Sequence, residues 1–158
     1  MTEESRKTIL AAIDLSEASG AILRQAREFA AALGARVWVL HVADPDPAFV
    51  GREVDPEVMR DDVAREYRRE HQELQRLSQG LRDAGVESTA LLVQGSTAET
   101  ILEEAGRLKA DMIVIGSYGK GGVRRLLFGS TSEDVLQSAN VPVLVVPTHE
   151  QALNPDQA

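Results

Sequence analysis

The sequence predicts an α/β fold with a single doubly wound sheet of five parallel strands and helices on both faces. Short apolar runs alternate with segments of helical periodicity, and short turns separate them. The first run, residues 8–13, reads Thr-Ile-Leu-Ala-Ala-Ile and is typical of a strand that is buried on both faces of a parallel sheet. Because crossovers between parallel strands are right-handed, the expected strand order is 3-2-1-4-5.

The expected arrangement is Rossmann-like or flavodoxin-like, with five strands and four helices in alternation. The first helix is expected between Ser16, as its N-cap, and Gly34, which ends it. The later helices are expected over residues 55–84, 97–109 and 130–139, and the strands over residues 8–13, 37–42, 86–93, 112–115 and 141–146. Apolar residues recur at helical spacing in the first helix: Ala18, Ala21, Ile22, Ala26, Phe29, Ala30 and Leu33.

Two further helix starts carry a serine followed three residues later by a glutamate. Ser96 with Glu99, and Ser130 with Glu133, have the spacing of a capping box. In such a box each side chain pairs with a backbone amide that the helix leaves without a partner. Ser96 is therefore expected to cap its helix, and a cap is one of two possible roles for Ser130.

Size and composition favour one domain over residues 1–148, followed by a disordered tail over residues 149–158. The chain has no cysteine, which excludes disulfides and thiolate metal sites. No apolar run approaches the roughly 18 to 20 residues of a membrane span, and the polar start does not resemble a secretory signal, so a cytoplasmic location is expected. The net charge of -8 argues against a nucleic-acid or membrane-surface protein.

Two unusual strand ends are expected to meet in one crevice. The first strand ends at Asp14 and the fourth at Gly116. In the order 3-2-1-4-5 these strands are neighbours at the point where the strand order reverses, and ligands of such sheets bind there. The crevice is the predicted binding site.

A glycine-rich turn, residues 116–122, follows the fourth strand. It lacks the spacing of a P-loop and that of a dinucleotide fingerprint, and it shows Gly116-x-x-Gly119-x9-Gly129-Ser130 instead. This spacing resembles the ATP-binding signature of the universal stress protein family. The resemblance covers nearly the whole chain, through Ile13-Asp14-Leu15-Ser16, His41-Val42 and the last strand. Tyr118 departs from it, because family members usually carry His there.

The resemblance implies ATP as the ligand, and Mg²⁺ would bind through its phosphates. Glycines would let backbone amides approach the ribose and phosphates, and the start of the last helix favours an anion. Asp14 would accept hydrogen bonds from adenine or ribose, and Val42 would pack against the adenine. The nucleotide-binding residues so assigned are Ala12, Ile13, Asp14, Val42, Gly116, Ser117, Gly119, Lys120, Gly129, Ser130 and Thr131.

Structural roles compete with these assignments. Glycines also serve tight turns, Asp14 also suits a turn after a strand, and Ser130 also suits a helix cap. Arg124 and Arg125 could add to phosphate contacts with Lys120, although exposed basic side chains are usually only solvated. These alternatives remain open at this point.

Four functional classes compete. The leading hypothesis is an ATP-binding regulatory protein of the stress-response type that acts on an unknown protein partner. A slow ATPase or self-phosphorylating enzyme is an alternative, although no catalytic constellation is visible around the scattered His41, His71 and His149. A nucleotide-independent interaction dimer is another. A flavodoxin-like electron carrier is disfavoured by the few aromatic residues.

The last strand, Val141–Val146, falls at an edge of the predicted sheet and is apolar and β-branched. Exposed edges of this kind pair with another chain unless they are protected. Antiparallel pairing of two copies across a two-fold axis would form a homodimer, which the family resemblance also implies.

Overall fold

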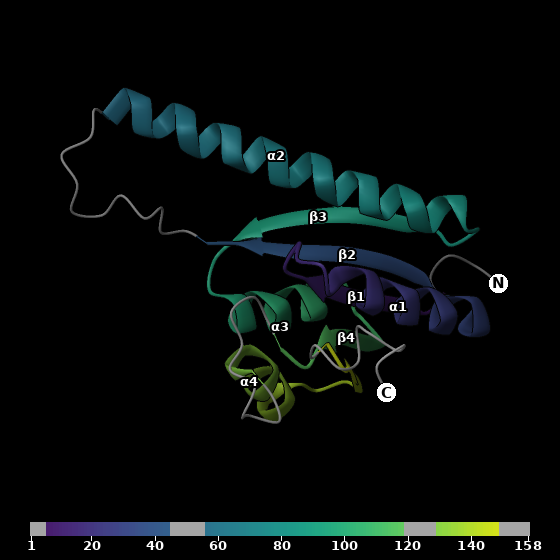
Figure 1. Cartoon of the computed structure of the whole chain (residues 1–158). Helices are drawn as coiled ribbons and strands as arrows, with labels where there is room; N and C mark the ends of the chain where they lie inside the picture. Colours follow the sequence, from purple (N-terminus) through teal and green to yellow (C-terminus); the bar gives the residue numbers. More distant parts are fainter. Residues whose placement is uncertain (1–5, 45–55, 119–128, 149–158) are drawn as a thin grey trace, which may run out of the picture.

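The computed structural model describes residues 6–44, 56–118 and 129–148. In these residues strands and helices alternate along the chain (Figure 1). The strands form one parallel sheet in the order β3-β2-β1-β4-β5, which confirms the predicted fold and strand order. The elements are β1 Thr8–Ile13, α1 Ser19–Leu33, β2 Arg36–Ala43, α2 Pro56–Asp83, β3 Ser88–Gln94, α3 Thr97–Arg107, β4 Met112–Gly116, α4 Ser130–Ser138 and β5 Val143–Val146.

Two hydrophobic clusters cover the two faces of the sheet. Strand β1 supplies both, because successive side chains of a strand point to opposite faces. Ile9 and Ala11 pack with residues of α1 and α2, whereas Leu10 packs with residues of α3 and α4. All three side chains are almost completely buried, as a central parallel strand requires.

The longest helix, α2, packs along β3 and extends past the carboxyl end of that strand (Figure 1). Leu74 and Leu81 are buried on its sheet side. On its outer face exposed arginines pair with acidic residues three positions earlier, as Arg76 does with Glu73. The hydrogen bond from Arg76 lowers the pKa of the half-exposed Glu73. Among the described residues, no helix is both long enough and apolar enough to cross a membrane.

The first helix begins later than predicted. Its N-cap is Ala18, so the prediction that Ser16 is the N-cap is wrong. The reason is an extra turn: the Ser16 amide donates to Asp14 Oδ1 at 3.0 Å, and the Ser16 hydroxyl accepts from the Ala18 amide at 3.3 Å. At the other end Gly34 is the C-cap with φ 64°, as predicted.

Two residues on the apolar pattern of α1 are exposed. Phe29 is 37% exposed and Leu33 is 48% exposed, while Leu23, outside the predicted pattern, is buried. The buried face includes Ile22 and Ala26, which leaves Phe29 at its rim and Leu33 in the last turn. Periodicity therefore located the helix but not the limits of its buried face.

The two capping boxes do not form. Ser96 is the N-cap of α3, as predicted, but its side chain makes no capping hydrogen bond. The N-cap of α4 is Gly129 rather than Ser130, because the Glu133 amide donates to the Gly129 carbonyl oxygen at 3.0 Å. Ser130 is therefore the first helical residue, which agrees with its predicted place at the start of this helix, and the alternative that it caps the helix is excluded.

Strand boundaries shift by one or two residues at the edges of the sheet. Strand β5 begins at Val143 rather than Val141. Pro142 has no amide to donate, although its carbonyl oxygen accepts from the Ile113 amide at 3.0 Å. Strand β3 begins at Ser88 rather than Val86, because the Val86 amide donates to the Leu81 carbonyl oxygen and closes the end of α2.

Replacing glycine by alanine is expected to have opposite effects on stability at two positions, Gly80 and Gly34. Gly80→Ala is expected to raise the free energy of unfolding by up to about 1 kcal/mol, because Gly80 lies inside α2 and an added Cβ would meet open space. Gly34→Ala is expected to lower it by about 1 kcal/mol, because the left-handed φ of 64° penalises a side chain. Urea denaturation of both variants measures these changes, and equal signs would contradict the assignment of the two backbone conformations.

Candidate functional site

The crevice arises where β1 and β4 stop pairing with each other. Their ladder ends at Ala11 and Val114. Beyond that point β1 pairs with β2 as far as Ile13, and β4 pairs with β5 as far as Gly116. Two residues at the end of each strand are thus free of the ladder between them, at the reversal of strand order.

Asp14 follows β1 and presents an unpaired acceptor. Its Oδ1 accepts from the Ser16 amide, whereas Oδ2 is buried and has no hydrogen-bond partner among the described residues. The next residue, Leu15, has a φ of 60°, a left-handed conformation that costs a leucine about 1 kcal/mol or more. The chain therefore holds a buried carboxylate oxygen in place, and such an atom ordinarily has a donor.

The start of α4 docks on the end of β4. The Ser132 hydroxyl donates to the Gly116 carbonyl oxygen at 2.6 Å, and the Gly129 amide donates to the Ser117 carbonyl oxygen at 2.7 Å. No side chain caps this helix start. Its first amides and the helix dipole therefore favour an anion beside the crevice. Ser130 is exposed there and Thr131 is half-buried.

Thr148 closes the same edge of the sheet from beyond β5. Its hydroxyl accepts from the Tyr118 amide at 3.0 Å and donates to the Tyr118 carbonyl oxygen at 3.1 Å. Its own amide donates to the Ser117 hydroxyl at 3.0 Å. We call these contacts the Thr148 latch. Sequence analysis did not single out Thr148 or Ser132; the available signal was a hydroxyl side chain just beyond a strand end or inside a first helical turn.

Gly116 also has a packing role. A Cβ at this position would lie 3.0 Å from Thr148 Cγ2 and 3.1 Å from Ile22 Cδ1. These contacts are tighter than most Cβ contacts, so a side chain at this position would force Thr148 or Ile22 to shift by a few tenths of an ångström. The space over Gly116 is therefore occupied by protein atoms.

The apolar residues predicted for the site belong to the walls of the sheet. Val42 is 9% exposed and packs on the α3 and α4 side, with Ala12 partly buried against the same cluster. Ile13 is 6% exposed and packs on the α1 and α2 side. Only the rims of these residues are open to a ligand.

His41, at the end of β2, connects the crevice to α2. Its Nδ1 lies 2.9 Å from the Ile13 carbonyl oxygen, and because that oxygen only accepts, Nδ1 carries the proton. Its Nε2 lies 3.4 Å from Glu70 Oε2. The ring thus braces the strand end that precedes Asp14, a role that sequence analysis did not assign.

Gly119 and Lys120, together with Arg124 and Arg125, lie outside the described residues. In residues 6–44, 56–118 and 129–148, no group of three or more His, Asp or Glu side chains could hold a metal ion. The described part of the crevice therefore offers acceptors, hydroxyls and a helix start.

Comparison with known proteins gives one consistent result. The sequence model of the universal stress protein family matches residues 5–147. A universal stress protein of Thermus aquaticus is 38% identical over 141 residues, which cover 89% of this chain and 98% of that protein. The solved structure of MJ0577 from Methanocaldococcus jannaschii is similar with a TM-score of 0.75 at 28% identity, over 91% of this chain and 97% of the other. The universal stress protein of Archaeoglobus fulgidus solved in complex with dAMP has a TM-score of 0.60 at 25% identity, over 89% and 97%.

Proposed function

Because the chain belongs to the universal stress protein family, we propose that it is a regulatory protein that binds ATP in the crevice between the ends of β1 and β4. A family member has been solved with the adenine nucleotide dAMP, which supports a nucleotide as the ligand class. The proposal assigns the chain a cytoplasmic role in the stress response. Its effect depends on whether the crevice is occupied, and catalysis is not required.

The observation that carries the proposal is the buried Oδ2 of Asp14, which has no hydrogen-bond partner in the part of the chain that the structure describes. An adenine amino group or a ribose hydroxyl is a neutral donor that this carboxylate oxygen can accept without bringing another negative charge close to it. The phosphates, which are negative, belong at the other side of the crevice, where α4 begins. The polarity of the crevice thus orients the nucleotide.

Mg²⁺ is proposed to bind only together with ATP, through the phosphate oxygens. The described residues hold no cluster of acidic or histidine ligands that would bind the cation alone. Mg²⁺ commonly keeps several waters and binds through phosphate oxygens. Lys120, with Gly119, is assigned to the phosphates from the glycine signature.

Regulation is proposed to act through the edge strand. The Thr148 latch joins the residues after β4 to the residue two positions beyond β5. Changes in the crevice therefore reach β5 through a short stretch of backbone. We propose that β5 forms a homodimer by pairing with a second copy, and that this surface passes nucleotide occupancy to a protein partner.

The test is calorimetric titration with ATP. The native chain is expected to bind ATP, and Gly119→Val is expected to remove binding because a branched side chain would block the backbone approach. Asp14→Asn is expected to weaken binding about tenfold. The asparagine oxygen can still accept from the Ser16 amide, and its NH₂ group then stands where Oδ2 would accept from the nucleotide. Glu103→Gln, an exposed charge change on α3, serves as the control. A native chain that binds no ATP at millimolar concentration would overturn the proposal.

The proposed dimer has its own test. Val145→Lys is expected to yield a monomer in light scattering, because a charged side chain at the middle of β5 would be desolvated in the paired edge. Leu33→Lys, which changes an exposed apolar residue of α1, is expected to leave the dimer intact. Dimers of equal mass for both folded variants would refute the β5 interface.

A further inference from the structure

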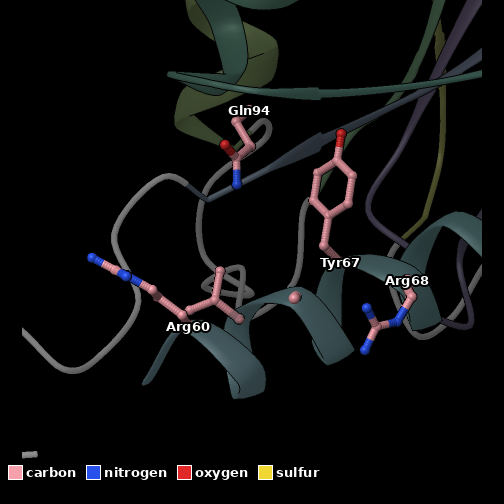
Figure 2. Close-up of a pocket in the computed structure, with 6 residues that line it drawn as sticks. Arg60, Tyr67, Arg68 and Gln94 are labelled. Carbon is pink, nitrogen blue, oxygen red and sulfur yellow. The ribbon is translucent and has the colours of Figure 1, made fainter. Parts of the chain in front are cut away.

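A second hollow lies over the N-terminal half of α2, apart from the proposed nucleotide crevice. It has a volume of about 520 Å³, within the range of roughly 300 to 1,000 Å³ that is usual for small-molecule sites. Figure 2 shows Gln94 across from the helix, with the Tyr67 ring rising toward it. We call this hollow the α2 pocket; its lining residues are Arg60, Val63, Ala64, Tyr67, Arg68 and Gln94.

The middle of the α2 pocket is apolar. Val63, Ala64 and the ring of Tyr67 form its helix side and are only partly exposed. The Tyr67 hydroxyl donates to the Leu92 carbonyl oxygen at 3.4 Å, which holds the ring against β3. Gln94, the last residue of β3, adds one amide that can donate and accept. A fixed aromatic ring beside aliphatic side chains suits a flat or branched apolar group.

The charges at the rim are unlike those on the rest of α2. Arg65, Arg69 and Arg76 each pair with an acidic side chain three residues earlier. Arg82 donates to Gln79 and to the Ser88 carbonyl oxygen. In the described part of the chain, the other two arginines of α2 have no such partner, and these are the pocket residues Arg60 and Arg68.

The guanidinium groups of Arg60 and Arg68, which have no acidic partner among the described residues, flank the apolar middle. Figure 2 shows Arg60 and Arg68 on opposite sides of Tyr67. Eight residues separate them along the helix, which corresponds to about 12 Å at the rise of an α-helix. A chain with a net charge of -8 has little general attraction for anions, so any preference for them must come from these local arginines.

We propose that the α2 pocket binds a small organic anion with an aromatic body. Its acidic group would bind Arg60 or Arg68, and its aromatic body would pack against the Tyr67 ring. Carboxylate, sulfonate or phosphate groups would take the guanidinium donors, and the body would cover Val63 and Ala64. The site is separate from the crevice that Asp14 and Gly116 define. The protein would therefore have a second small-molecule binding site, on α2.

The test uses anilinonaphthalene sulfonate (ANS), an aromatic anion that fluoresces in apolar sites, titrated into the full chain without added nucleotide. Saturable binding of one dye per chain is expected. The double variant Arg60→Gln/Arg68→Gln is expected to weaken it about tenfold or more through the loss of charged hydrogen bonds. It is expected to leave binding of the neutral dye N-phenyl-naphthylamine within about twofold, because the apolar middle is unchanged.

The matched control is Arg65→Gln/Arg69→Gln, which removes the same charge from the same helix outside the α2 pocket. It is expected to change ANS binding less than about twofold, since both arginines are already paired. Circular dichroism confirms that both variants fold. The proposal is overturned by the absence of saturable binding or by equal losses in the two double variants.

Discussion

A Leu74→Ala chain is expected to lose about 2 to 5 kcal/mol of its free energy of unfolding, the usual range for emptying a leucine site in a core. Leu74 is completely buried and packs in the cluster that joins α1, α2 and the sheet. Helix α2 is otherwise heavily charged and has few apolar anchors, among them Leu77 and Leu81. Losing one anchor therefore weakens the attachment of the whole helix. Urea denaturation monitored by circular dichroism measures the change.

Leu33→Ala is the matched control, because it deletes the same atoms from an exposed position. Its effect is expected to stay within about 0.5 kcal/mol, as for most surface substitutions. If the two leucine variants lost equal stability, α2 would not be held to the sheet through Leu74, and its packing in the buried cluster would be wrong.

Thr148→Val is expected to lower the free energy of unfolding by about 1 to 3 kcal/mol and to weaken ATP binding. The substitution keeps the shape of the side chain but leaves the Tyr118 amide and carbonyl oxygen without the hydroxyl that satisfies both. Thr148 is only 6% exposed, so water cannot easily replace the lost contacts. Denaturation and ATP calorimetry on the same variant measure both effects.

Thr148→Ser separates the hydrogen bonds from the packing. It keeps the hydroxyl and removes the methyl group that lies over Gly116, at a cost of about 1 kcal/mol. ATP affinity is expected to stay near that of the native chain. A serine variant that loses as much affinity as the valine variant would show that the methyl contact, rather than the latch, shapes the crevice.

Much of the fold was predictable because its signals are local. The almost unbroken apolar run of β1 predicted a strand buried on both faces, and helices do pack on both faces of this strand. Gly34 marked the end of α1 because few other residues adopt its left-handed conformation. The cap at Ser16 was predicted wrongly and the role of Ser130 was left open, since a serine side chain has several local partners and only the surrounding backbone selects among them.

The site was predictable in part. Asp14 and Gly116 were located by their places at strand ends, and the strand order brings those ends together. The Thr148 latch and the bond from Ser132 to Gly116 join residues that lie far apart in sequence. No pattern of neighbouring residues signals such pairs. The α2 pocket was missed for the same reason, because Gln94 and Tyr67 belong to different elements.

The sequence by itself determined the fold class, the strand order and the family, because alternating apolar runs and glycine spacing depend on residues close together along the chain. Only the tertiary structure decided which polar atoms are paired. Among the described residues it left Asp14 Oδ2 without a donor and the pocket arginines without acids, while it paired both the amide and the hydroxyl of Thr148. The physical reason is that a hydrogen bond depends on distances of about 3 Å between atoms, and folding alone sets those distances between remote residues.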